Sequence, residues 1–194
     1  QYYETRYNPR LAVPEYAQHF ESWGKRSEQA RAALHRYLDL PYGSHPMEKL
    51  DVFRAKGASR GLLMFIHGGY WRALDKSQHS FVARPLAEAG VTVAMINYAL
   101  CPAVTVEEIV RQVLQAGAWL YRNGGNFGAP YHRLHVAGHS AGGHLTAMML
   151  AAQWTPVISN VSLPMQMRLV GDLLASRPAE TGFTLLAVGG KTLG

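Results

Sequence analysis

Cysteines, long apolar runs and a leader-like start are scarce or missing in this 194-residue chain. Its single cysteine, Cys101, has no partner for an internal disulfide, and such a chain suits a reducing cytosol. No apolar run reaches the roughly 18 residues that a membrane span requires, and no basic-then-apolar pattern opens the sequence. These absences predict a cytoplasmic protein that does not insert into a membrane.

Metal-binding patterns are missing as well. There is no cysteine-rich spacing, and the histidines outside the motifs described below form no His-x-x-x-His pairs among themselves. Such spacing would bring several ligands together on one helix or turn. We therefore expect neither a metal site nor a cofactor.

The positive charge is not concentrated in one place. The formal net charge is +6, but the lysines and arginines are scattered, with no basic stripe and no interleaved aromatic platform. Nucleic-acid binding requires such a footprint, so we expect no nucleic-acid partner. A solvated basic surface explains the charge, and attraction of an anionic or zwitterionic substrate is the alternative.

The chain does have an alternation of strand-like and helix-like segments. Its 48% hydrophobic and 16% charged residues are typical of one globular domain. The patterns predict helices at 14–38, 76–89, 105–124 and 142–153. They also predict a half-buried strand at 50–53, buried strands at 61–66, 91–96 and 134–137, and later strands at 167–170 and 183–188. This alternation indicates an α/β fold with a mostly parallel sheet and helices on both faces.

The most informative motif is Gly-x-Ser-x-Gly at 138–142, between a predicted strand and a predicted helix. At such a junction the motif is the signature of a nucleophile elbow, in which Ser140 stands at the tip of a tight turn. Side chains at the flanking positions would clash, which explains the glycines. The following helix would present its N–H groups to an anion. A phosphate-binding turn, or a merely tight one, is the alternative interpretation.

A second motif, His-Gly-Gly-Tyr-Trp at 67–71, follows the strand predicted at 61–66. Acyl hydrolysis needs donors aimed at the charge that develops on the carbonyl oxygen. The expected donors are the N–H groups of Gly68, Gly69 and Ala141. Tyr70 and Trp71 either line a substrate pocket or pack the loop.

Three histidines close to these motifs are not expected to act as the catalytic base. His67 belongs to the loop and more plausibly fixes it by hydrogen bonding. His139 precedes the serine, and its side chain should point away from the substrate. His144, on the following helix, is expected to be a packing or surface residue.

The set of motifs resembles the kynurenine formamidase (arylformamidase) group of α/β-hydrolases, which are relatives of the hormone-sensitive-lipase-type esterases. The shared segments are 7–10, 13–14, 50–53, 67–71, 97–102 and 138–144. The resemblance implies an α/β-hydrolase fold and hydrolysis of the small molecule N-formyl-L-kynurenine to kynurenine and formate, a step of tryptophan breakdown. A homodimer is left open. We expect a single domain, 1–194, made of an N-terminal helical cap segment (1–45), a sheet-and-helix core (46–154) and a divergent, truncated C-terminal segment (155–194).

The expected Ser-acid-His triad is incomplete in this sequence. α/β-Hydrolases place an acid and then a histidine after the serine, but no histidine follows His144. After Ser140 the only carboxylate residues are Asp172 and Glu180. Asp172 is the candidate acid, with a loop or helix-cap role as the alternative. The base histidine is not present.

Three explanations remain open for the missing base. The chain is a C-terminally incomplete fragment, which we favour, or the region after Trp154 carries a deletion or an altered reading frame, or this is a short homologue with lost function. The leading hypothesis is a formamidase-like serine hydrolase with little or no turnover as it stands. The alternatives are a broad-specificity carboxylesterase for small aryl or acyl esters and a catalytically inactive scaffold.

Overall fold

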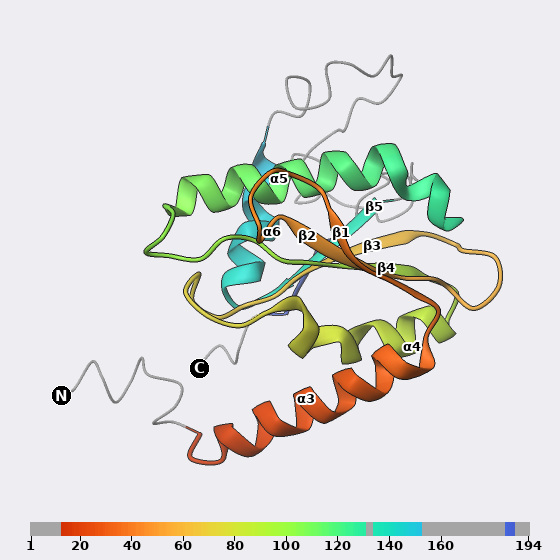
Figure 1. The fold of residues 1–194 in the computed structure, drawn as a ribbon, viewed down its shortest axis with the longest axis horizontal. Helices are drawn as coiled ribbons and strands as arrows, with labels where there is room; N and C mark the ends of the chain where they lie inside the picture. Colours follow the sequence, from red (N-terminus) through yellow and green to blue (C-terminus); the bar gives the residue numbers. More distant parts are fainter. Residues whose placement is uncertain (1–12, 131–133, 153–184, 189–194) are drawn as a thin grey trace, which may run out of the picture.

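The computed structural model describes residues 13–130, 134–152 and 185–188, the last of these as backbone only. Figure 1 shows helices and strands alternating along most of this part of the chain. In chain order the elements are α3 (Tyr16–Ala33), β1 (Arg36–Pro41), β2 (Lys49–Phe53), β3 (Leu62–Ile66), the 3₁₀ helix η1 (Lys76–Val82), α4 (Ala83–Glu88), β4 (Thr92–Ile96), α5 (Val106–Asn123), the 3₁₀ helix η2 (Gly124–Phe127), β5 (Leu134–His139), α6 (Ala141–Ala151) and β6 (Leu185–Val188). Within this part, none of the helices combines the length and apolarity of a membrane-crossing segment.

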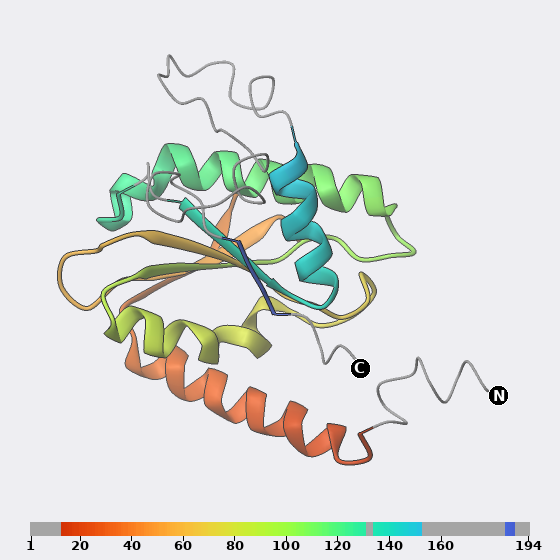
Figure 2. The same cartoon turned by 180° about the vertical axis from the view of Figure 1, so that it is seen from behind.

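The strands form one sheet in the order β1-β2-β4-β3-β5-β6. β4, β3, β5 and β6 run parallel to one another, whereas β1 and β2 pair antiparallel at one edge. Figures 1 and 2 show α5 and α6 on one face of the sheet and η1 with α4 on the other, with α3 lying outside η1 and α4. The predicted α/β fold with a mostly parallel sheet and helices on both faces is confirmed.

The central strands are buried because helices cover both of their faces. Every residue of β4 is buried, and β3 is buried except at Leu63. Side chains alternate between two apolar layers, so that Met64 and Ile66 join the cluster under α5 and α6 while Phe65 joins the cluster under α4. The continuous apolar runs predicted as buried strands at 61–66 and 91–96 are therefore confirmed.

Helix α5 begins where its capping residues predict. The Thr105 side chain accepts a hydrogen bond from the N–H of Glu108, and Glu107 and Glu108 lie in the first turn. A capping hydroxyl satisfies one of the unpaired N–H groups, and acidic residues complement the positive end of the helix dipole. The helix expected over 105–124 is confirmed.

The helix predicted for 14–38 is too long, and the segment 1–45 is not wholly helical. Helix α3 ends at Ala33, Leu34 is extended, and β1 follows. Tyr37 pairs with Val52 of β2, and its ring packs against Phe127 at 5.1 Å between centroids. The helical spacing of the last apolar residues is overridden because they find partners in the sheet, which lies far away in sequence.

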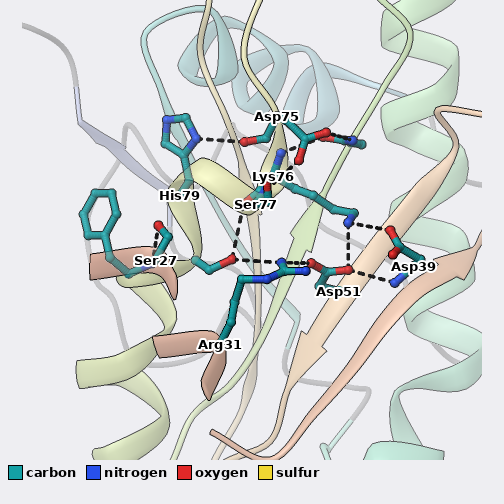
Figure 3. A network of polar contacts seen from close by, with 11 residues as sticks. Ser27, Arg31, Asp39, Asp51, Asp75, Lys76, Ser77 and His79 are labelled. Carbon is teal, nitrogen blue, oxygen red and sulfur yellow. Dashed lines mark hydrogen bonds and ion pairs between the residues drawn. The ribbon is translucent and has the colours of Figure 1, made fainter. Parts of the chain in front are cut away.

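The strand predicted as half-buried at 50–53 is buried at all four positions. Asp51, the polar residue of this segment, is 0% exposed. Figure 3 shows why: Arg31 and Lys76 approach its carboxylate at 2.5 and 2.8 Å. The N–H of Asp39 donates to the same carboxylate at 2.8 Å. Charge pairing thus makes an acidic residue tolerable inside the fold.

The helix predicted for 76–89 consists of two pieces. It starts as η1, capped by the Asp75 side chain, continues as α4, and the chain turns at Gly90, whose φ is 84°. The strand expected at 183–188 is present as β6. The strand expected at 167–170 lies outside the described residues.

We expect Asp51→Asn to destabilise the fold strongly, because it leaves Lys76 and Arg31 without their shared carboxylate. Removing one partner of a buried ion pair costs about 3–5 kcal/mol. In urea unfolding, the midpoint should fall while the slope stays unchanged.

The matched control is Glu88→Gln, which breaks the exposed Arg84–Glu88 pair. An exposed pair of this kind contributes about 0.3–0.5 kcal/mol. Equal losses in the two variants would show that the buried cluster carries no special share of stability.

Candidate active site

Ser140 stands at a sharp turn between β5 and α6. Its backbone has φ 54° and ψ −118°, a conformation that residues other than glycine rarely adopt. The residue is exposed. Backbone strain of this kind costs about 1–3 kcal/mol and persists only where the surrounding structure enforces it. The serine hydroxyl is therefore held out at the N-terminal end of α6, as the nucleophile-elbow motif predicts.

Close packing on both sides enforces the turn. A Cβ atom at Gly138 would collide with the carbonyl of Gly142 and come 2.6 Å from the Thr146 hydroxyl. A Cβ at Gly142 would collide with the carbonyl of Ile66 and come 2.7 Å from that of His67. The expectation that side chains at the flanking positions would clash is confirmed.

The loop after β3 lies directly beside the elbow. β3 and β5 are parallel neighbours in which Ile66 is paired with Gly138, so both chains leave the sheet at the same edge. A Cβ atom placed on Gly68 would be 2.7 Å from the carbonyl oxygen of His139 and 3.1 Å from the Cβ of Ser140. The structure thus brings together the two motifs that the sequence places 73 positions apart.

Three backbone N–H groups at this edge have no acceptor among the described residues. No described residue accepts a hydrogen bond from the N–H of Gly68 or Gly69. Ala141 is the first residue of α6, where the N–H has no partner within the helix. These are the groups that the sequence predicts as oxyanion donors, and their role stays a prediction.

The loop that carries the two glycines is tightly wound. Gly69 has φ 109°, and Tyr70 and Trp71 both have φ 57°. The Gly69 carbonyl accepts hydrogen bonds from the N–H groups of Arg72 and Ala73, each at 3.0 Å. This compact turn keeps the chain from extending away from Ser140.

His67 is buried and braces the loop. Its Nδ1 lies 2.7 Å from the carbonyl oxygen of Gly68, and its ring stacks on Tyr98 at 4.4 Å between centroids. Burial lowers the pKa of His67 to about 4, so the ring is neutral at neutral pH and Nδ1 donates to this carbonyl. These contacts support the hydrogen-bonding role expected for His67.

The two aromatic residues after the glycines differ in their exposure to solvent. Tyr70 is 74% exposed, whereas Trp71 is partly buried and packs against the apolar cluster under α5 and α6. The exposed His144 contacts the Trp71 ring edge-on at 5.3 Å between centroids. Trp71 thus packs the loop, His144 lies at the surface as expected, and only Tyr70 is largely open to solvent.

His139 faces the opposite side of the sheet from α6. Its ring contacts Trp23 of α3 edge-on at 5.9 Å, and burial lowers its pKa. It borders an apolar cavity of about 530 Å³ under α3 and α4. Ser140 does not line this cavity, whose walls are Trp23, Leu63, Phe65, His79, Phe81, Val82, Leu86, Val91, His135, Ala137 and His139.

A complete triad is not seen among the described residues. Asp172, the candidate acid, lies outside them, and within the described ranges no side chain is hydrogen-bonded to the Ser140 hydroxyl. The same ranges contain no cluster of three or more His, Cys, Asp or Glu side chains that could hold a metal. Within the described ranges, Ser140 therefore lies beside the N–H groups of Gly68 and Gly69, and no side chain there is placed as its base.

Sequence reasoning missed the residues that hold the loop from behind. The Asn97 side chain accepts a hydrogen bond from the N–H of Lys76 at 2.7 Å. It also donates one to the Asp75 carboxylate at 2.5 Å. The N–H of Cys101 donates to the carbonyl of Trp71 at 2.8 Å. The motif at 97–102 was the available signal, but its residue types do not reveal which loop they would contact.

Comparison with known proteins agrees with this geometry. The chain is 32% identical over 158 residues to a kynurenine formamidase from Danio rerio, covering 80% of this chain and 53% of that protein. It is 28% identical over 126 residues to an isoprenylcysteine alpha-carbonyl methylesterase from Arabidopsis thaliana, covering 64% of this chain and 30% of that protein. The chain thus spans about half or less of the length of these relatives.

Solved structures show the same fold. A crystal structure from Silicibacter sp. TM1040 superposes with a TM-score of 0.67 and 38% sequence identity, covering 74% of this chain and 53% of the other. The sequence profile described as alpha/beta hydrolase fold matches residues 63–170, more than half of the chain. The chain therefore belongs to the alpha/beta hydrolase fold family.

Proposed function

We propose that this protein is a serine hydrolase of the formamidase type, acting on N-formyl-L-kynurenine with Ser140 as nucleophile. The observation that carries the proposal is the strained, exposed Ser140 beside the Gly68–Gly69 loop, whose two N–H groups donate to no described residue. The identity to a kynurenine formamidase supports the choice of substrate.

In the proposed reaction, the Ser140 oxygen attacks the formyl carbonyl carbon and a tetrahedral oxyanion forms. The N–H groups of Gly68, Gly69 and Ala141 stabilise its negative charge, and the N-terminal end of α6 adds its dipole. Breaking the C–N bond releases the kynurenine amine with a proton, and water then hydrolyses the formyl-serine to formate. A base must carry these protons, and the chain has no histidine after His144.

The second candidate function is carboxylesterase activity on small aryl or acyl esters. It uses the same nucleophile and the same N–H groups, because ester hydrolysis passes through the same kind of oxyanion. The similarity to a methylesterase favours it specifically. The two candidates differ in substrate and share the site.

We expect Ser140→Ala to abolish the hydrolysis that the parent chain shows, because the nucleophilic oxygen is gone. Release of kynurenine or of nitrophenol measures it. The control is Ser22→Ala, an exposed serine on α3, which should keep full activity.

A fluorophosphonate probe tests the same residue without turnover. Peptide mapping should find the label on Ser140. A chain that is folded, unlabelled and inactive would contradict the proposed function and favour a scaffold role.

We expect kcat/KM for N-formyl-L-kynurenine to exceed that for 4-nitrophenyl acetate once both are corrected for uncatalysed hydrolysis. The reason is that a site matched to the aryl formamide stabilises its transition state selectively. Steady-state rates with both substrates on one preparation give the ratio. Activity on the ester alone would reject the formamidase assignment and leave the carboxylesterase.

A further inference from the structure

A buried tyrosine touches the back of the glycine loop. Tyr98 is 0% exposed and comes from the segment directly after β4. Its hydroxyl donates to the carbonyl oxygen of His67 at 2.8 Å and lies 3.4 Å from that of Gly68. Its ring stacks on the His67 imidazole, which itself bonds the Gly68 carbonyl. Two successive carbonyls are thus held from the same side by one pair of stacked rings.

Because of peptide geometry, these contacts also fix the direction of the neighbouring N–H groups. A trans peptide is planar, and its C=O and N–H groups point in opposite directions. The His67 carbonyl shares its plane with the Gly68 N–H, and the Gly68 carbonyl shares its plane with the Gly69 N–H. Fixing the two carbonyls therefore fixes the direction of the two N–H groups that make no hydrogen bond to a described residue.

We propose that Tyr98 is a positioning residue that aims the N–H groups of Gly68 and Gly69 at the developing oxyanion. This inference rests on the proposed function of Ser140. Gly68 abuts Ser140, so the aimed groups lie next to the nucleophile. The loop needs such an anchor because its next residues, Gly69, Tyr70 and Trp71, all have positive φ and would relax if released.

The protonation state of Tyr98 fits this role. Burial raises the pKa of Tyr98 above its ordinary value, so the hydroxyl remains a donor throughout the physiological pH range. A purely structural role would satisfy the hydroxyl equally well. The two roles differ in what is lost when the hydroxyl is removed: stability alone, or the rate of the chemical step as well.

The test is Tyr98→Phe, which keeps the ring stack and removes only the hydroxyl. We expect kcat to fall about 10- to 100-fold while KM stays within about twofold, because misaimed N–H groups weaken only transition-state binding. The control is Thr92→Val, which also removes one buried hydroxyl. Thr92 is 0% exposed, and its hydroxyl donates to that of Ser59 at 3.0 Å at the start of β4, the end of the strand away from Tyr98.

Thr92→Val should also lose stability and should keep kcat within about twofold of the parent. Equal kcat values in the two variants would overturn the positioning role, even if both were less stable. Neither variant replaces a group that contacts the substrate, so a selective effect of Tyr98→Phe on kcat reports on how the loop is aimed.

Failure of the proposed function is recognised separately. If the parent protein hydrolyses neither substrate and Ser140 resists the probe, the hydrolase proposal falls. The positioning of the loop is then measured by NMR on glycine-labelled protein. In Tyr98→Phe the Gly68 and Gly69 amide signals should shift or broaden while that of Gly90 does not, and Thr92→Val should leave the Gly68 and Gly69 signals in place. Unchanged Gly68 and Gly69 signals in Tyr98→Phe would overturn the inference without any turnover.

Discussion

The parallel pairing of β3 with β5 is the constraint on which the candidate site depends. With Ile66 opposite Gly138, both strands end at one edge, and α6 can start only where Gly142 fits against the carbonyls of Ile66 and His67. Any side chain at Gly142 would push the helix away from the sheet. Ser140 and the glycine loop are therefore placed by one packing contact between backbones, and this contact is possible only because Gly142 has no side chain.

A second support comes from charge buried at β2, on the antiparallel side of the sheet. Asp51 ties α3 to η1 through Arg31 and Lys76. Lys76 directly follows Asp75, whose carboxylate bonds Asn97, the neighbour of Tyr98. Polar contacts therefore run without interruption from the outer helix to the residues behind the glycine loop. Buried polar groups whose hydrogen bonds are satisfied rigidify a structure. Here these contacts end at Asn97 and Tyr98, which lie behind the glycine loop beside Ser140.

Sequence patterns predicted what depends on local chemistry and missed what depends on distant partners. Glycines around Ser140 and the Thr105 cap are local devices, and both were predicted correctly. The start of strand β1 was taken for helix, and the strand at 50–53 for half-buried, because their partners come from other parts of the chain. The hydroxyl of Tyr98 was missed for the same reason: a tyrosine after a strand does not say which carbonyl it will meet.

The proposed hydrolysis requires two things, stabilisation of an oxyanion and transfer of a proton. Stabilising an oxyanion requires donors that are already aimed, since reorienting them during the reaction would cost the energy they supply. Moving a proton requires a base whose pKa suits the working pH. Among the described residues, the first task has Gly68 and Gly69 held through His67 and Tyr98, whereas no group is hydrogen-bonded to the Ser140 hydroxyl for the second. Within the described part of the chain, the contacts that hold the His67 and Gly68 carbonyls come from the sheet and its first loops, and the proposed oxyanion role of the Gly68 and Gly69 N–H groups rests on these contacts.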